Sequence, residues 1–239
     1  MQPTMNHQIM GYDRSSTMFS PDGRLLQVEY AKKAVRQGTI SVGVVCKDGV
    51  LLIGDKRLLD KLVVSKSIEK VFKIDDHVVA VATGYLMDGR VLIERAQLMA
   101  QQHKITYDTE VDILSLVKEI ANIKQAYTQY GGSRPFGVSI MFGGVDDEGP
   151  QLFVTDVTGM YFEYKATAVG ENYQQVKEIL DKEYQDNMTM EDGLKMSLNA
   201  LKTVFSGDFD IDKLDCIYIH KTNGIMRFKS ENLKKIIRK

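Results

Sequence analysis

The chain has 239 residues, of which 44% are hydrophobic and 26% charged, and its formal net charge at pH 7 is −1. These values are ordinary for a globular protein and exclude a general electrostatic attraction to nucleic acid or to anionic membranes. No apolar run reaches the roughly 18 residues that a membrane span requires, and no signal peptide opens the sequence, so we expect a cytoplasmic protein.

A polar tail over residues 1–14 is followed by strong helix signals over residues 20–36. Ser20 is a favourable N-cap, and Pro21 suits the first helical position, where its missing N–H costs nothing. Apolar residues then recur at helical spacing along one face, at Leu25, Val28, Ala31 and Val35. An amphipathic helix is therefore predicted, and its apolar face must pack on the rest of the chain or on a neighbouring subunit.

Strand patterns follow in three blocks of short, β-branched, apolar runs that end at turn residues. The predicted strands cover residues 39–46, 50–54, 62–64, 70–74 and 77–83, then 136–142, 151–157 and 160–167, and finally 214–220 and 224–228. The almost continuous apolar run over residues 50–53 indicates a strand that is covered on both faces.

Cysteine and histidine give no sign of metal chemistry. Cys46 and Cys216 each lie in an apolar, strand-like run and are expected to be buried. The four histidines are scattered along the chain without the spacing of metal ligands. We therefore expect no metal and no cofactor.

Two pairs of helices are predicted between the strand blocks, over residues 92–103 and 113–127, then 175–184 and 190–205, and Ser230 caps a short C-terminal helix. Because strand blocks alternate with helix pairs and not with single helices, the order does not fit a βαβ winding. Two antiparallel sheets stacked face to face, with a helix pair on each outer face, would bury every apolar stripe. We therefore predict an α+β fold, a four-layer α-β-β-α sandwich over residues 39–239, within one domain of residues 1–239.

The N-terminal segment also carries a distinctive run of residues. Tyr12, Thr17, the run Phe-Ser-Pro-Asp-Gly-Arg at 19–24 and Gln-Val-Glu-Tyr-Ala at 27–31 resemble the N-terminal signature of α-type proteasome subunits. The resemblance continues through residues 38–39, 49–57, 67–70 and 127–135, covers most of the chain, and is greatest to the archaeal form. It implies the same four-layer sandwich, which is the scaffold of the N-terminal nucleophile hydrolases.

The resemblance implies a non-catalytic subunit of a threonine-type endopeptidase complex. Such subunits form a homo-heptameric ring that stacks on proteasome β subunits and gates the entry of unfolded protein substrates. A regulatory AAA ATPase would dock on this ring through C-termini that end in a hydrophobic–tyrosine–X sequence.

The matching positions imply three groups of site residues. The gate would consist of Tyr12, Asp13, Arg14, Pro21 and Tyr30, where Asp13 and Arg14 of adjacent tails can form charge-assisted contacts. The activator-binding pocket would consist of Gly38, Lys70 and Tyr85, and the pore constriction of Tyr130, Gly131, Gly132 and Ser133. Tyr85 departs from the smaller apolar residue that the family pattern leads us to expect.

A second reading treats the chain as a β-type threonine peptidase that is processed at Gly38–Thr39. By position, Thr39, Asp55 and Lys70 resemble the threonine, aspartate and lysine of the catalytic subunits. In that chemistry the free α-amine of the first residue is the base, and the nitrogen of an internal Thr39 is an amide and therefore no base. We favour the non-catalytic reading, in which Asp55, Lys56 and Arg57 form an ion-pair cluster.

Overall fold

The computed structural model describes residues 11–57, 62–63, 68–207 and 209–237. Along the chain the elements are α2 (Leu26–Gln37), β1 (Ser41–Cys46), β2 (Gly49–Asp55), β3 (Val71–Asp75), β4 (Val78–Gly84), α3 (Leu86–Tyr107), α4 (Ile113–Tyr127), β5 (Val138–Asp146), β6 (Gly149–Thr155), β7 (Tyr161–Glu163), β8 (Ala166–Val169), α5 (Tyr173–Glu183), α6 (Met190–Val204), η2 (Ile211–Lys213), β9 (Leu214–His220), β10 (Gly224–Phe228) and α7 (Ser230–Ile237). No helix in these ranges is long and apolar enough to cross a membrane.

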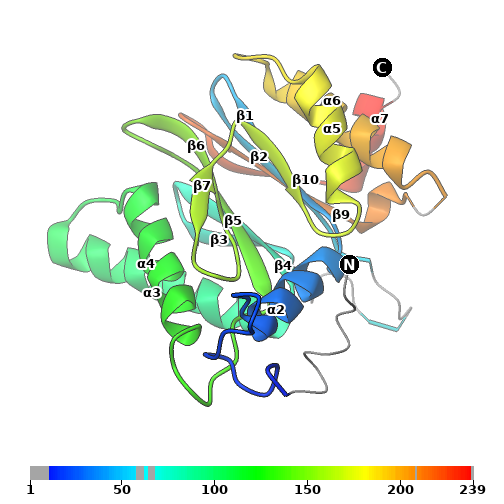
Figure 1. Ribbon diagram of the computed structural model, residues 1–239. Coiled ribbons are helices and arrows are strands. Elements are labelled where there is room, and N and C mark those ends of the chain that lie inside the picture. Colours follow the sequence, from blue (N-terminus) through cyan, green and yellow to red (C-terminus); the bar gives the residue numbers. More distant parts are fainter. Residues whose placement is uncertain (1–10, 58–61, 64–67, 208, 238–239) are drawn as a thin grey trace.

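The strands form two five-stranded sheets, in the orders β10-β9-β2-β1-β8 and β3-β4-β5-β6-β7. Every pairing between neighbouring strands is antiparallel. Figure 1 shows α3 and α4 on the outer side of one sheet and α5, α6 and α7 on the outer side of the other. The predicted α-β-β-α sandwich is confirmed.

Strand β2 shows how the sequence builds these layers. Val50 and Leu52 point between the two sheets, whereas Leu51 and Ile53 belong to the core under α5 and α6. Successive side chains of a strand point to opposite faces, so a strand that is covered on both sides must be apolar throughout. All four of these residues are buried, as the continuous apolar run predicted.

Glycines let the two sheets approach each other closely. A Cβ atom added at Gly43 of β1 would lie 2.8 Å from the Leu152 side chain and would also meet the Met141 sulfur. A Cβ atom at Gly143 of β5 would lie 2.8 Å from the Val50 side chain. The space between the sheets at these points is therefore filled by the neighbouring side chains alone.

The first helix begins later than predicted. Helix α2 starts at Leu26, and Leu25 occupies the N-cap position without a side-chain cap. Ser20 instead opens a turn, in which the Gly23 N–H donates to the Ser20 carbonyl at 2.8 Å and the Arg24 N–H donates to the Ser20 hydroxyl at 3.2 Å. Gly23 has φ +73°, which a helix does not allow. The predicted amphipathic helix is confirmed over residues 26–36, but its start with Ser20 as N-cap and Pro21 in the first turn was wrong.

Two strand predictions also need correction. Leu62 and Val63 lie in a turn and a bend, and residue 64 lies outside the described residues. The predicted strand over residues 160–167 is two strands that belong to different sheets, β7 beside β6 and β8 beside β1. The chain crosses between the sheets here, since the Tyr164 N–H donates to Leu152 and the Lys165 carbonyl accepts from Val45.

Because the sheets approach closely at Gly43, two glycine substitutions should differ clearly in their effect on the free energy of unfolding. Gly43→Ala should lower the free energy of unfolding by about 1–3 kcal/mol, because the added methyl group overpacks the space between the sheets. Gly131→Ala is the control, since a Cβ atom there meets no atom within 4 Å. Urea denaturation midpoints measure both changes, and equal midpoints for the two variants would contradict this account of the core.

Candidate functional site

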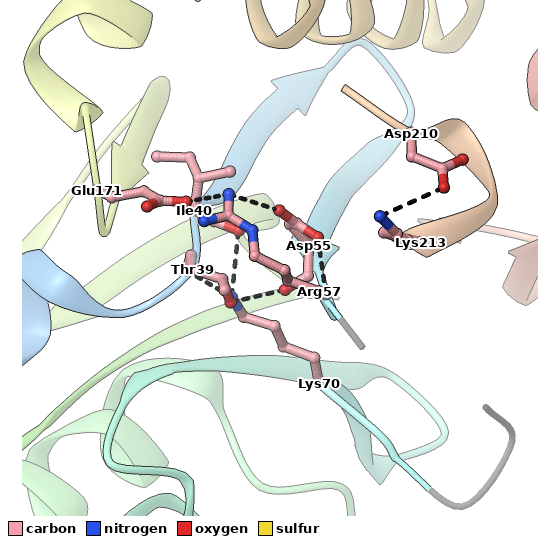
Figure 2. A network of polar contacts seen from close by, with 8 residues as sticks. All are labelled: Thr39, Ile40, Asp55, Arg57, Lys70, Glu171, Asp210 and Lys213. Carbon is pink, nitrogen blue, oxygen red and sulfur yellow. Dashed lines mark hydrogen bonds and ion pairs between the residues drawn. The ribbon is translucent and has the colours of Figure 1, made fainter. Parts of the chain in front are cut away.

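The residues around the start of β1 form a polar network that joins distant parts of the chain (Figure 2). Lys70 immediately precedes β3. Its amine donates to the Thr39 carbonyl at 2.5 Å, to the Ile40 carbonyl at 3.2 Å and to the Thr39 hydroxyl. The Thr39 hydroxyl donates in turn to the Asp55 carbonyl at 2.6 Å. Lys70 therefore joins the edge of one sheet to the first residues of the other.

Lys70 is a buried lysine, with only 2% of its surface exposed. Burial lowers the pKa of its amine to about 7, although the carboxylates of Asp55 and Glu171 act in the opposite direction. An ammonium group has three donors, and this site supplies three acceptors, all of them uncharged. The hydrogen bonds therefore offset part of the cost of burying the charge.

Ion pairs surround this contact, and of the predicted cluster the Asp55–Arg57 pair is confirmed, whereas Lys56 lies outside it. The Arg57 guanidinium pairs with the Asp55 carboxylate at 3.3 Å and also contacts the Glu171 carboxylate. Lys56 turns away from both and pairs with Asp215 at 3.5 Å. Glu171 could not be inferred from the sequence, because it follows β8 and no local pattern links it to Arg57.

The geometry leaves Thr39 without the free α-amine that acts as base in N-terminal threonine chemistry. Its nitrogen is part of a peptide bond, and its hydroxyl proton is directed at a carbonyl. The residue before it is also built into the fold, since the Gly38 N–H donates to Ala34 and Val35, and the Gly38 carbonyl accepts from Glu171 at 2.8 Å. An internal threonine held in this way lacks the α-amine that activates an N-terminal threonine as a nucleophile.

The three predicted pocket residues lie at one junction of the fold. Gly38 ends α2, Lys70 contacts the next residue, and Tyr85 precedes α3. Gly38 and the end of β4 are in close contact, because a Cβ atom at Gly38 would lie 2.6 Å from the Gly84 nitrogen. The Tyr85 side chain is 53% exposed, whereas Lys70 is buried beneath the surface.

An ion pair supports Tyr85, and sequence reasoning did not assign it. The Arg134 guanidinium binds the Asp88 carboxylate through two hydrogen bonds of 2.6 Å and lies 5.9 Å from the centre of the Tyr85 ring. Asp88 also accepts from the Gly137 N–H at 2.8 Å. The pKa of Asp88 is lowered, because these hydrogen bonds and the charge of Arg134 outweigh the effect of its burial.

Two of the predicted gate residues, Asp13 and Tyr30, are in contact at the N-terminal side of α2. The Tyr30 hydroxyl donates to the Asp13 carboxylate at 3.3 Å, and the Gln27 side chain donates to the Asp13 carbonyl at 2.5 Å. Arg14 closes a turn with Gly11, whereas Pro21 is exposed in the turn that precedes the helix. Tyr12 lies in the first turn beside them, and residues 1–10 of the predicted tail lie outside the described residues.

The predicted constriction loop follows α4 and lies beside the residues that follow the tail. The Ser16 hydroxyl donates to the Tyr130 carbonyl at 3.5 Å, and Figure 1 shows the N-terminal segment and this loop on the same side of the molecule. Tyr130 is 62% exposed. Added Cβ atoms at Gly131 and Gly132 would meet nothing within 4 Å, and Ser133 closes a turn with Tyr130.

A second buried lysine lies between α4 and the sheet, on the apolar stripe of that helix. Lys124 is fully buried and donates to Val138 at 3.1 Å and to the carbonyl and hydroxyl of Thr155 at 3.2 and 2.8 Å. Its burial lowers the pKa of the amine to about 7.

The described residues contain no group of side chains that could hold a metal ion.

Two family models match consecutive parts of the chain. The model of the N-terminal signature of A-type proteasome subunits matches residues 12–34, and the model of the proteasome subunit itself matches residues 35–219. The chain belongs to the proteasome subunit family. The N-terminal match identifies it as an α-type member, and the resemblance inferred from the sequence is confirmed.

Curated relatives named "Proteasome subunit alpha" are similar over most of their length. The protein of Methanocaldococcus jannaschii is 49% identical over 229 residues, which cover 95% of this chain and 87% of that protein. The protein of Archaeoglobus fulgidus is 46% identical, with coverage of 88% and 85%, and that of Methanosarcina barkeri is 43% identical, with coverage of 95% and 89%. The α-type matches agree with a Thr39 whose nitrogen is an amide, so this chain is a non-catalytic proteasome subunit.

The buried lysines predict an unusual pH dependence of stability. In the folded subunit the pKa of both Lys70 and Lys124 is about 7, against 10.5 for a free lysine. Between these values the unfolded chain binds more protons than the folded one, so the free energy of unfolding should rise with pH. Urea denaturation at several pH values from 7 to about 10 measures this slope.

Lys70→Met should remove part of that slope, because one of the two shifted groups is lost. Lys33→Met is the control, since Lys33 is exposed on α2. If the slope were the same in the wild type, Lys70→Met and Lys33→Met, the buried amine would not be the source of the pH dependence.

Proposed function

We propose that this chain is the gating subunit of a proteasome core particle in the cytoplasm. Seven copies would form an outer ring that stacks on β subunits, and the β subunits would supply threonine-type peptidase sites. The observation that carries the proposal is the α-type N-terminal segment, which matches over residues 12–34 and is folded onto the sandwich directly ahead of Thr39. Such a subunit would form part of the outer ring and would control the entry of substrates, without cleaving them.

The ring requires an interface that the single chain leaves open. The apolar face of α2, formed by Val28, Ala31 and Val35, packs against Val157 of the same chain, so this face does not itself need a partner. Support for a partner comes from the residues just ahead of the helix, because Met18 and Phe19 are 43% and 63% exposed. In a cyclic ring, two different patches of neighbouring copies meet, and these side chains would be covered there.

Sedimentation of the purified full chain at micromolar concentration tests the ring. We expect a species of about seven subunits, whose mass does not change on moderate dilution. Phe19→Asp should shift this species towards smaller assemblies, because it would place a charge in an apolar contact. A wild-type chain that sediments as a monomer would contradict the proposal.

The tail would form the gate. Contacts from Gln27 and Tyr30 to Asp13 anchor its base on α2, and the Ser16 contact with Tyr130 brings it to the loop that would line the pore. A polar segment with this anchor can change between closed and open arrangements without disturbing the sandwich. Unfolded substrate would pass the glycines of the loop, where copies of the chain can approach the axis of the ring.

Deletion of residues 1–11 should speed the hydrolysis of short peptides by the assembled particle, because the pore would no longer be covered. The matched control is a particle with the full tail and the same β subunits, assayed with the same fluorogenic peptide. Equal rates in the two particles would count against a gating role of the tail.

The pocket of Gly38, Lys70 and Tyr85 would receive the C-terminus of a regulatory AAA ATPase. The exposed Tyr85 ring offers an apolar surface for the hydrophobic–tyrosine part. A protonated Lys70 amine beneath it would bind the terminal carboxylate in place of one of its three internal acceptors. A charge-assisted hydrogen bond of this kind contributes roughly 1.5–3 kcal/mol.

Lys70→Ala should abolish binding of a peptide that ends in hydrophobic–tyrosine–X while the ring stays assembled, and Tyr85→Ala should weaken it. Lys73→Ala is the control, because Lys73 is exposed and pairs only with Asp76 among the described residues. Fluorescence anisotropy of the labelled peptide measures the affinity, and gel filtration measures assembly. Unchanged affinity in an assembled Lys70→Ala ring would remove Lys70 from the pocket.

A further inference from the structure

A cavity of about 300 Å³ lies beneath the C-terminal half of α2, outside the gate and the activator pocket. It is bounded by α2, by the ends of β5 and β6, by the crossing from β7 to β8, and by the start of α5. Its lining combines cations of two helices with apolar residues of the strands and one tyrosine. We propose that this cavity binds a small anionic amphiphile, a molecule with a short apolar body and one carboxylate.

The charge of the lining supports an anion. Three cations line the cavity, Lys32, Arg36 and Lys177, against one carboxylate, Asp156, so the lining carries +3 −1 = +2 in a chain whose net charge is −1. Lys32 and Arg36 are one helical turn apart, and neither has an ion pair or hydrogen bond to the described part of the chain. Two positive side chains on one wall are thus available to a ligand.

The single carboxylate is already engaged by its own turn. One oxygen of Asp156 accepts from the Thr158 N–H at 2.8 Å, from the Thr158 hydroxyl at 2.5 Å and from the Met160 N–H at 3.1 Å. Its charge therefore serves mainly to close the turn after β6. It offsets the cations of α2 only in part, and the cavity stays positive.

The floor of the cavity is apolar, which distinguishes the site from a plain phosphate or sulfate site. Val154, Val157 and Ala168 are buried, with 9% or less of their surface exposed, and Val35 of α2 also lines the cavity. Because most of this apolar surface is already buried, it can accommodate only a short hydrocarbon group, and it cannot replace the water around a compact inorganic anion. The volume lies at the lower end of the range of small-molecule sites, which favours a short chain over a nucleotide.

Two further side chains suit the head group. The Lys177 amine lies 5.7 Å from the centre of the Tyr164 ring, which holds this cation at the wall of the cavity. Burial raises the pKa of Tyr164, so its hydroxyl keeps its proton and can donate to a carboxylate. A ligand held by α2 on one side and by α5 and the strands on the other would brace the helix against the sandwich.

Octanoate is a suitable probe, and methyl NMR of the assembled full chain gives a local readout. With labelled valine and alanine, octanoate should shift the methyl signals of Val35, Val157 and Ala168 saturably. Octanol and octylamine, which share the hydrocarbon chain, should bind at least about tenfold more weakly, because they lack the negative charge. Hydrogen exchange in the last turns of α2 should slow when octanoate is bound.

A matched pair of variants on one helix sharpens the test. Lys32→Gln, and more strongly the double variant Lys32→Gln with Arg36→Gln, should weaken octanoate binding about tenfold, since they remove the charges that line the cavity. Lys33→Gln makes the same change on α2 outside the lining and should leave the affinity unaltered. The proposal is overturned by an absence of saturable shifts, by equal affinity for octanol, or by an equal loss in Lys33→Gln.

Discussion

The contact between Lys70 and the start of β1 is the constraint on which the rest of the site depends. A buried amine must satisfy its donors inside the protein, and the only acceptors within reach among the described residues are the Thr39 and Ile40 carbonyls and the Thr39 hydroxyl. These atoms lie just ahead of β1, in the opposite sheet from β3, which follows Lys70. One side chain therefore links the starts of two strands in different sheets at the point where the N-terminal segment enters the sandwich.

The same contact explains why residues that resemble those of a peptidase have a structural role in this protein. Its threonine, aspartate and lysine lie together, which is the arrangement that the peptidase reading required. Here the Thr39 hydroxyl donates a hydrogen bond to the Asp55 carbonyl, and the Asp55 carboxylate binds Arg57. Lys70 donates to two backbone carbonyls and to the Thr39 hydroxyl. The N-terminal helix continues directly into β1 through Gly38, so the nitrogen that would act as base stays in an amide. Side chains similar to those of the catalytic subunits thus connect the N-terminal segment to the two sheets.

Much of the fold could be predicted from sequence, because its signals are periodic and local. The two-faced burial of β2 follows from the apolar run at 50–53, and the alternation of strand blocks with helix pairs leaves few arrangements other than a sandwich. The start of α2 was misjudged because Ser-Pro-Asp-Gly at 20–23 is as typical of a type I turn as of a helix start. The switch between sheets after Tyr164 left no local signal at all.

The site was predictable where it depended on residue type and was hidden where it depended on long-range contacts. The pairing of Arg57 with Asp55 was expected from their clustering. Glu171 and the Lys56 partner Asp215 are brought in by the fold from far along the chain. Lys124 could have been noticed, because it falls on the apolar stripe of α4, where a lysine must find internal acceptors. The pairing of Asp88 with Arg134 joins α3 to the loop before β5 and required the structure.

The most direct test of the central claim is the covalent state of the chain at Gly38–Thr39. The native particle is first treated with an inhibitor that reacts with N-terminal threonine. Intact-mass and peptide mass spectrometry then show whether the bond between Gly38 and Thr39 is intact. We predict that peptides spanning Gly38–Thr39 are recovered uncut and that the inhibitor is absent from this chain. A chain that begins at Thr39 and carries the inhibitor would contradict the account.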